Sequence, residues 1–299
     1  MRVLVTGAAG YVGYAVCRRL AAAGHEVTAL VRRESPLPRG VRPHLADLLT
    51  PFTLDPCEAV CHLAARTRVR ESFDHPLDFY AANVQGTINL LRALPGTPTV
   101  IYGSTAAVYG TPETQPITES APPSPTSPYG ASKLAAEDLI RHHARTGAIG
   151  AVVLRTFNVA GSVDGRPDPD LTRLIPKALS VAAGEAPHLR VNGDGTAIRE
   201  YLHLDDLAAA YVLALDAAAP GTALTYNVGS GTGTSVQDVI TAVREVTGRP
   251  IPVEHAPPQP EPPLLMADST AIRRDLAWHP GRSALHEIIA DSWAALGHR

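Results

Sequence analysis

The first residues of the chain hold the feature that most constrains its fold. The run Val3-Leu4-Val5-Thr6-Gly7-Ala8-Ala9-Gly10-Tyr11-Val12-Gly13 begins as an apolar strand and ends in three glycines spaced G-x-x-G-x-x-G. A helical pattern follows at once, ends near Gly24, and leads into a second strand at Glu26–Val31. Glycine suits such a turn because a side chain would hold a ligand's phosphates away from the backbone, while the helix offers them free N–H groups and the positive end of its dipole. The arrangement predicts a dinucleotide-binding fold.

The composition argues against several other classes of protein. The chain has 299 residues, enough for one large or two small domains, and a formal net charge of −3. Its Lys and Arg residues form no basic stripe, which argues against nucleic-acid binding. No run approaches the ~18 apolar residues of a membrane span, and the chain enters a strand without room for a signal peptide. We therefore expect a cytoplasmic protein with neither nucleic acid nor a membrane as partner.

No metal site is expected. The three cysteines, at positions 17, 57 and 61, lack metal-ligand spacing, and Cys61 lies in an apolar strand pattern typical of a reduced core residue. His142-His143 lies on a predicted helix with no carboxylate at ligand spacing. We therefore assign no metal ligand.

Strand and helix patterns alternate through the first half of the chain. Strands are expected at 26–31, 41–45, 59–63, 99–103 and 151–157, and helices at 12–23, 76–94 and 129–146. Such alternation implies parallel strands with helices on both faces. The segment 111–128, rich in Pro, Ser and Thr, is expected to form a loop near the site. We predict an α/β fold with a Rossmann-type doubly wound parallel sheet in residues 1–160.

The second half is less regular. Helices are expected at 171–183, 204–218, from Ser235 to Gly248, and at 283–296, with strands near 189–191, 200–203 and 225–228 and an extended proline tract at 257–263. The segment 203–229 is expected to return to the main sheet. Residues 161–202 and 230–299 would then form a smaller, mixed α/β substrate-binding domain.

The strongest chemical pattern is Tyr129-Gly130-Ala131-Ser132-Lys133. Positions i and i+4 share a helix face, so the phenol and the ammonium are expected side by side. A nearby ammonium favours phenolate and lowers the pKa of the tyrosine, which suits a general base or acid acting on a sugar or alcohol hydroxyl. Upstream, Ser104 and Thr105 follow a predicted strand at the carboxyl edge, where open α/β sheets bind ligands.

With these motifs the chain resembles the extended short-chain dehydrogenases/reductases, in the sugar-nucleotide epimerase/dehydratase branch, from Arg2 to near Trp293. The matching motifs are Thr6-Gly7-Ala8-Ala9-Gly10-Tyr11-Val12-Gly13, Asp47-Leu48, His62-Leu63-Ala64-Ala65, Asn83-Val84-Gln85-Gly86-Thr87, Ser104-Thr105, Tyr129 with Lys133, Arg155-Thr156-Phe157-Asn158, and Gly193-Asp194-Gly195 through Arg199 to Asp205-Asp206. The resemblance implies a tightly bound nicotinamide cofactor, NAD or NADP, and a nucleotide-sugar substrate.

The resemblance also implies a role for each matching position. Thr105 would hydrogen-bond the reacting sugar hydroxyl, Tyr129 would exchange its proton, and Lys133 would hold the nicotinamide ribose and tune Tyr129. The cofactor would be held by Gly7, Gly10, Tyr11, Val12, Arg32, Arg33, Asp47, Leu48, Leu63, Ala64, Ala65, Asn83, Tyr129, Lys133 and Phe157. The substrate would be held by Thr67, Ser104, Thr105, Asn158, Arg199 and Gln259. Asn158 and Arg199 would hold its diphosphate, because the planar fork of an arginine meets phosphate oxygens in pairs. His62 would be structural.

Two alanines narrow the reaction. Similar 4,6-dehydratases and decarboxylases place an acidic residue just after the catalytic hydroxyl, whereas this chain has Ala106 and Ala107. Elimination or decarboxylation would therefore have no evident acid or base. We predict a nucleotide-sugar 4-epimerase that favours a UDP-hexose. Tyr129 would take the C4 hydroxyl proton, the nicotinamide would take the C4 hydride, and the 4-keto sugar would turn over and receive the hydride on its other face.

Three departures from the family pattern keep alternatives open. Val31 stands where the acid that grips the ribose 2′-OH of NAD is usual, and the following Arg32 and Arg33 suit the 2′-phosphate of NADP. Gln259 replaces a second diphosphate-binding arginine, and Val191-Asn192 replaces an aromatic residue that stacks on the base. The rival function is an NADPH-dependent 4-ketoreductase of a nucleotide-activated (deoxy)sugar. The complete catalytic set disfavours a regulator that binds the cofactor without catalysis.

The family resemblance also implies a homodimer. The apolar faces of the predicted helices 76–94 and 129–146 resemble those that form a four-helix interface between subunits in this family.

Overall fold

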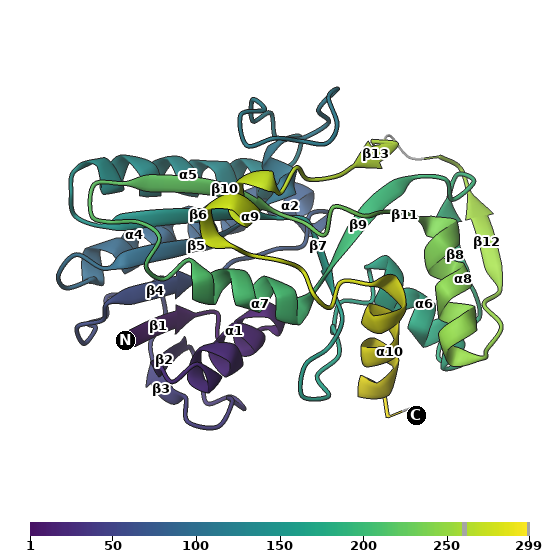
Figure 1. Ribbon diagram of the computed structural model, residues 1–299, viewed down its shortest axis with the longest axis horizontal. Helices are drawn as coiled ribbons and strands as arrows, with labels where there is room; N and C mark the ends of the chain where they lie inside the picture. The colour runs from purple at the N-terminus through teal and green to yellow at the C-terminus, as the bar shows by residue number, and fades with distance from the viewer. Residues whose placement is uncertain (259–261, 298–299) are drawn as a thin grey trace.

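A parallel seven-stranded sheet, in the order β10-β6-β5-β4-β1-β2-β3, forms the central layer (Figure 1). The computed structural model describes residues 1–258 and 262–297. The strands are β1 (Arg2–Thr6), β2 (Glu26–Val31), β3 (Arg42–Leu45), β4 (Ala59–His62), β5 (Thr99–Thr105), β6 (Gly150–Thr156) and β10 (Ala223–Val228). The strand order reverses between β1 and β4, and ligands of doubly wound sheets bind at such a switch point. The predicted fold class is confirmed, and β10 joins the sheet beside β6, as predicted.

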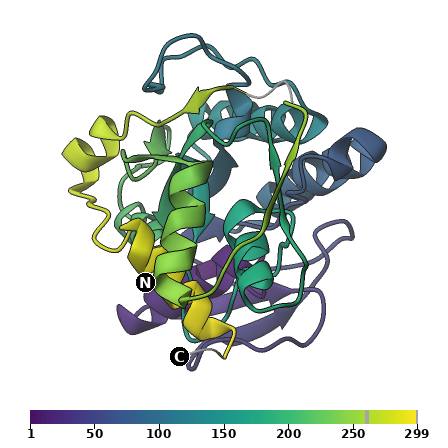
Figure 2. The ribbon, with the colours of Figure 1, turned by 90° about the vertical axis from the view of Figure 1, so that its right-hand side faces the viewer.

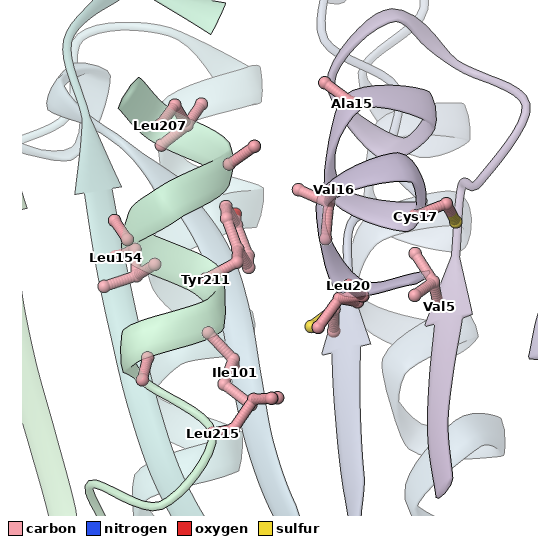
Figure 3. Close-up of a cluster of buried hydrophobic side chains, with 14 of the residues drawn as sticks. Val5, Ala15, Val16, Cys17, Leu20, Ile101, Leu154, Leu207, Tyr211 and Leu215 are labelled. Atoms are coloured by element: carbon pink, nitrogen blue, oxygen red, sulfur yellow. The ribbon is translucent and has the colours of Figure 1, made fainter. Parts of the chain in front are cut away.

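Helices cover both faces of this sheet. The helices α1 (Tyr11–Ala22) and α7 (Leu204–Leu213) pack on one face, and α4 (Gly86–Ala93) and α5 (Pro128–Arg145) pack on the other (Figure 1). Because successive side chains of a strand leave on opposite faces, Val5 of β1 joins the first of these cores while Leu4 joins the second. Figure 3 shows the first core, where Tyr211 of α7 lies near Leu154 of β6.

A second lobe holds its own hydrophobic core, at the right of Figure 1 and facing the viewer in Figure 2. In it β12 pairs with β8, and β9 pairs with β7, β11 and β13. Its elements are β7 (Asn158–Ala160), α6 (Leu174–Ala182), β8 (Leu189–Asn192), β9 (Ile198–His203), β11 (Gly233–Ser235), α8 (Val236–Thr247), β12 (Val253–Ala256), β13 (Leu264–Leu265) and α10 (Leu285–Ala295). Ser235 and Asp238 form a capping box at the start of α8, and Gly248 ends the helix with a φ of 65°.

The predicted helix 76–94 is interrupted. It consists of α3 (Pro76–Tyr80), a π-helical turn (Ala81–Gln85) and α4, and the short α2 (Glu71–Asp74) precedes it. A π-helical turn holds about one residue more than an α-turn, and a pattern of apolar residues does not register that difference.

Other boundaries also differ from the prediction. The strand predicted at 99–103 continues to Thr105, so both hydroxyl residues lie inside β5, and the helix predicted at 204–218 ends at Leu213. β7, β11, β13, α2 and α9 (Thr270–Leu276) were not predicted, because elements this short show no clear period. The proline tract 257–263 lies partly outside the described residues.

In the described part of the chain, no helix combines the length and apolar character needed to cross a membrane. Residues 1–258 and 262–297 also contain no cluster of three or more His, Cys, Asp and Glu side chains that could hold a metal ion. Cys61 is fully buried and unpaired, in agreement with its prediction as a reduced core residue, and burial raises the pKa of its thiol.

Candidate active site

The glycine turn lies between β1 and α1 and is too tight for side chains. Gly7 has a φ of +68°, and a Cβ atom on it would lie 2.7 Å from the backbone nitrogen of Ala64. A Cβ on Gly13 would lie 2.1 Å from the carbonyl oxygen of Gly7. The structure thus brings Gly7 and Gly10 against the first turn of α1, which starts with Tyr11 and Val12. This cradle fits the phosphates of a dinucleotide, because backbone can approach there and the N-terminus of α1 faces them.

Tyr11 extends from this turn toward the second lobe. Its hydroxyl donates a hydrogen bond to the carbonyl oxygen of Gly161, at 2.5 Å. Burial raises the pKa of Tyr11 well above its usual value. Tyr11 therefore stays a neutral phenol and links the glycine turn to the chain just after β7.

His62, at the end of β4, holds the glycine turn in place. The backbone N–H groups of Leu63 and Ala64 both donate to the Thr6 hydroxyl at 3.1 Å, so that hydroxyl donates its own hydrogen bond to His62 Nδ1, 2.7 Å away. On the other side, the Thr87 hydroxyl donates to a carbonyl oxygen and therefore accepts from His62 Nε2, at 2.9 Å. Burial, and then the charge of Lys133, lower the His62 pKa to about 3. His62 is a neutral structural residue, as predicted.

Asn83, in the π-helical turn, connects the strand ends to the catalytic helix. Its Oδ1 accepts the backbone N–H of Arg66 at 2.8 Å, and its Nδ2 donates to the Arg66 carbonyl oxygen and to the Ser132 hydroxyl. Ser132 lies between Tyr129 and Lys133 on α5. The Asn83 side chain thus fixes the segment that contains Ala65 and Thr67 beside α5.

The structure brings Thr105 and Tyr129 together. A hydrogen bond from the Thr105 hydroxyl lowers the pKa of Tyr129, as does the charge of Arg173, but burial has the larger effect and raises it. Thr105 also accepts the N–H of Ala107 at 3.1 Å, which fixes its rotamer. Phe79 packs edge-on against the Tyr129 ring, with 6.3 Å between centroids. The result is a hydroxyl pair at the carboxyl end of β5, in which Tyr129 is buried and Thr105 is half-buried.

Lys133 is placed differently from its predicted position beside the phenol. Its Nζ lies 4.1 Å from the centroid of the Tyr102 ring, and the side chain is almost fully buried. Burial lowers the Lys133 pKa to about 7, against the opposing effect of Glu137. The prediction that the ammonium lowers the pKa of Tyr129 is wrong for this structure. The lysine turns to the Tyr102 ring and is not among the groups that shift that pKa, which burial raises.

Ser104 also differs from its prediction as a substrate contact. Neighbouring side chains of a strand leave on opposite faces, so Ser104 and Thr105 do not both face the site. The Ser104 hydroxyl donates to the buried carboxylate of Glu137 on α5. The structure therefore places Ser104 in the core beneath the site.

The predicted adenine end lies at the carboxyl ends of β2 and β3. Arg32 and Arg33 follow β2 and are exposed, whereas Val31 is buried. Asp47 accepts the N–H of residue 49 at 2.9 Å, and the carbonyl oxygen of Leu48 accepts a hydrogen bond from the side chain of residue 89 at 2.7 Å. These residues lie along one edge of the sheet, where a dinucleotide would extend from the glycine turn.

The residues predicted to bind the substrate lie on several separate elements, and some of them are exposed. Thr67 is exposed in the loop after β4, and Asn158 is exposed on β7, where its amide donates to the carbonyl oxygen of residue 200 at 3.2 Å. Arg199 lies on β9, which pairs with β7, and Phe157 is buried beside them. Gln259 lies outside the described residues.

Sequence reasoning missed one cation near the site. Arg173, just before α6, pairs with Asp168 at 3.0 Å and Asp170 at 3.6 Å. Its charge lowers the pKa of both Tyr129 and Tyr11, which places it close to the two phenols. No motif contains this arginine, and only the packing of α6 brings it to the site.

Taken together, these residues can exchange a proton with an alcohol. The hydroxyl pair of Thr105 and Tyr129, with Lys133 one helical turn away, lies at the switch point beside a phosphate cradle. Among the described residues, no carboxylate forms a hydrogen bond with Thr105 or Tyr129.

Comparison with known proteins agrees with this arrangement. Residues 3–229 match the model of the NAD dependent epimerase/dehydratase family. The UDP-glucose 4-epimerase of Corynebacterium glutamicum is 39% identical over 322 residues, covering 100% of this chain and 98% of that protein. A structure of UDP-glucose 4-epimerase from Bifidobacterium longum in complex with NAD+ and UDP is 30% identical, with a TM-score of 0.89, covering 99% and 98% of the two chains. RMD from Pseudomonas aeruginosa complexed with NADPH is 28% identical, with a TM-score of 0.85, covering 98% of each.

The burial of Lys133 predicts that this residue destabilises the cofactor-free protein. With a folded pKa of about 7 against 10.5, the unfolded chain binds more protons between these values. The destabilisation is therefore full below pH 7 and fades as the pH rises through this window. We expect Lys133→Met to raise the free energy of unfolding at pH 6 by up to about 4 kcal/mol, and by much less at pH 9. Urea unfolding at the two pH values measures the difference.

The partly exposed Lys177 provides the matched control. Lys177→Met should show no such dependence on pH. An equal effect of Lys133→Met at pH 6 and pH 9 would contradict the destabilising role of the buried charge.

Proposed function

Because the chain belongs to the NAD dependent epimerase/dehydratase family, we propose that it is a nucleotide-sugar 4-epimerase. It inverts C4 of an NDP-hexose, preferably a UDP-hexose, through a transient 4-keto sugar. One observation carries the assignment to a 4-epimerase: the Thr105–Tyr129 hydroxyl pair is followed by Ala106 and Ala107, without a carboxylate. The curated relative from C. glutamicum is a UDP-glucose 4-epimerase, which supports the same reaction.

The chain's own residues handle the proton. The Tyr129 phenolate takes the proton of the C4 hydroxyl, and Thr105 hydrogen-bonds that hydroxyl and aligns it. When bound, a nicotinamide cofactor would supply the hydride chemistry at C4. Tyr129 then gives the proton back to the C4 oxygen of the inverted sugar. Lys133 holds the nicotinamide ribose by donating hydrogen bonds from its ammonium group.

Substrate recognition combines both lobes. The diphosphate is held by Asn158 on β7 and Arg199 on β9, and Thr67 and Gln259 are further substrate-binding residues. The segments 161–202 and 230–299 serve as the substrate-binding domain, and 1–160 with 203–229 serves as the cofactor-binding domain. The separate hydrophobic core of the second lobe supports this division.

The cofactor is NAD or NADP. NAD is favoured by the Bifidobacterium longum structure, which holds NAD+. The exposed Arg32 and Arg33 at the end of β2 favour NADP, and with it the second candidate function, an NADPH-dependent 4-ketoreductase. The RMD structure, complexed with NADPH, supports this alternative.

The exchange of the C4 proton predicts that Tyr129→Phe removes epimerisation. We expect kcat for the interconversion of UDP-galactose and UDP-glucose to fall by about 10² or more, because general acid–base catalysis is lost. Chromatography of the two nucleotide sugars measures the rate. Tyr80→Phe, on the exposed tyrosine of α3, should retain full activity. Full activity in Tyr129→Phe would show that the proton is exchanged elsewhere.

The fate of reducing equivalents separates the two candidate functions. An epimerase should interconvert its sugars without added reductant, and mass spectrometry of the denatured protein should find the bound nicotinamide dinucleotide. A ketoreductase would consume NADPH stoichiometrically with a 4-keto sugar nucleotide, and absorbance at 340 nm would report this. The variant Arg32→Ser with Arg33→Ser serves as control: it should weaken the binding of NADP without weakening that of NAD.

A homodimer through the helices at 76–94 and 129–146 is part of the proposal. The apolar side chains of Phe73, on α2 just before these helices, and of Leu77, on α3, are 59% and 81% exposed. We expect a dimer by light scattering at micromolar concentration, and a monomer for Phe73→Asp with Leu77→Asp, because two buried carboxylates would oppose association. Leu45→Asp, which changes an equally exposed residue on β3, should remain dimeric. A wild-type monomer would refute the dimer.

A further inference from the structure

A buried carboxylate lies directly behind the catalytic lysine. Glu137 is on α5, four residues after Lys133 and eight after Tyr129, and its side chain is fully buried. Residues at these spacings share a helix face. None of the steps described above uses this group, and a buried charge is retained only where it is paired.

Glu137 is held by donors from three elements. Arg155 of β6 donates from Nε at 3.2 Å and from Nη2 at 2.8 Å, the Ser104 hydroxyl of β5 donates to Oε1, and Arg141 pairs with Oε2 from the next turn of α5. Arg141 in turn pairs with the exposed Asp138 at 2.6 Å. The carboxylate is thus paired with two guanidinium groups and has little freedom to move.

The network continues beyond Arg155 and anchors the cluster. Arg155 Nη1 donates to the Tyr109 hydroxyl at 2.9 Å, which donates to Asn227 Oδ1 on β10 at 2.7 Å. Asn227 donates from its side chain to the carbonyl oxygen of Ile117, at 2.8 Å. The cluster therefore connects α5 with three adjacent strands of the sheet and with the loop before α5.

Lys133 faces few charges. From β4 it meets His62, which is neutral, and from β5 the face of the Tyr102 ring. On its own helix it faces Glu137, one turn further on. In the described residues, Glu137 is the carboxylate whose charge opposes the effect of burial on Lys133, and burial alone would favour the neutral amine near pH 7.

We propose that Glu137 is a positioning residue for the reaction, which keeps Lys133 charged above the Tyr102 ring. This inference rests on the proposed function, in which the charged Lys133 holds the nicotinamide ribose. An ammonium offers the ribose hydroxyls three hydrogen-bond donors and no acceptor, whereas the neutral amine presents a lone pair to them. Ser104 and Arg155 act through Glu137 by holding its carboxylate in place.

The composition of the chain permits a direct test. Its two lysines are Lys133 and Lys177, so protein labelled with 13C-lysine shows two Cε signals, and Lys177 is an internal reference. In the protein as purified, we expect the titration midpoint of Lys133 to fall by about 1 or more in Glu137→Gln, because an opposite charge nearby is lost. The midpoint of Lys177 should not change. Asp138→Asn, which removes the exposed carboxylate next in sequence, should change neither midpoint.

Activity gives the second readout. The pH at which kcat falls on the alkaline side should move down in Glu137→Gln by the same amount as the Lys133 midpoint, and it should not move in Asp138→Asn. Glu137→Asp, which keeps the charge, should restore the pH profile. A purely structural role of Glu137 would lower kcat equally at every pH and leave the profile in place.

Two results would overturn the proposal: an unchanged Lys133 midpoint in Glu137→Gln, or a lowered midpoint with an unchanged pH profile of kcat. If Glu137→Gln does not fold, the double variant Glu137→Gln with Arg155→Met removes both partners of the buried pair, an exchange that proteins often tolerate, and the same fall is expected. The NMR titration needs no turnover. Failure of the wild-type protein to epimerise would therefore count against the proposed function alone, and the midpoints would still test the electrostatic role of Glu137.

Discussion

The candidate site depends on the hydrogen bonds of one neutral histidine, His62, which connects the glycine turn with the π-helical turn. His62 accepts a hydrogen bond on Nδ1 from Thr6, at the start of the glycine turn, and donates one from Nε2 to Thr87, behind the π-helical turn. A charged imidazole could not accept on Nδ1, so the bond to Thr6 would be lost. Burial lowers the His62 pKa to about 3 and so preserves this arrangement across the physiological range. From Thr87 the connection passes to Asn83 and on to Ser132 of the catalytic helix. Cofactor cradle and proton-exchanging residues are thereby fixed relative to each other.

Sequence reasoning was most successful where one residue type is physically required. Only glycine fits at positions 7 and 13, where a Cβ would meet backbone atoms, and the turn therefore predicted a dinucleotide-binding fold. Helix periodicity likewise placed Tyr129 and Lys133 on one helix. Helix periodicity does not, however, predict the direction in which a side chain points. Whether Lys133 turns to the phenol or to the Tyr102 ring depends on the strand beneath it. The position of Arg173 depends on the packing of α6, which is far in sequence from Tyr129.

β5 separates two kinds of chemistry. Thr105 ends the strand at the site, where its hydroxyl forms a hydrogen bond with Tyr129, the residue proposed to exchange the proton. Ser104, one residue earlier, donates a hydrogen bond to the buried Glu137 carboxylate and helps to hold it in place. Thr105 and Ser104 are similar in sequence, and nothing in the local pattern distinguishes them, because their roles follow from which face of the sheet each one meets. The polar residues beneath the site therefore contribute to its electrostatics although they do not line it.

Because of the π-helical turn at Ala81–Gln85, the number of residues in this segment determines which contacts form on either side of it. It holds one residue beyond what a regular α-helix would need. That extra residue sets the rotation of α4 relative to α3, so that Phe79 meets Tyr129 from one side of the turn while Thr87 meets His62 from the other. A single-residue deletion here could relax into an unbroken α-helix, which is locally more regular. It would nevertheless rotate one of these two contacts by about 100° out of phase. Over evolutionary time, this segment should therefore accept substitutions far more readily than insertions or deletions.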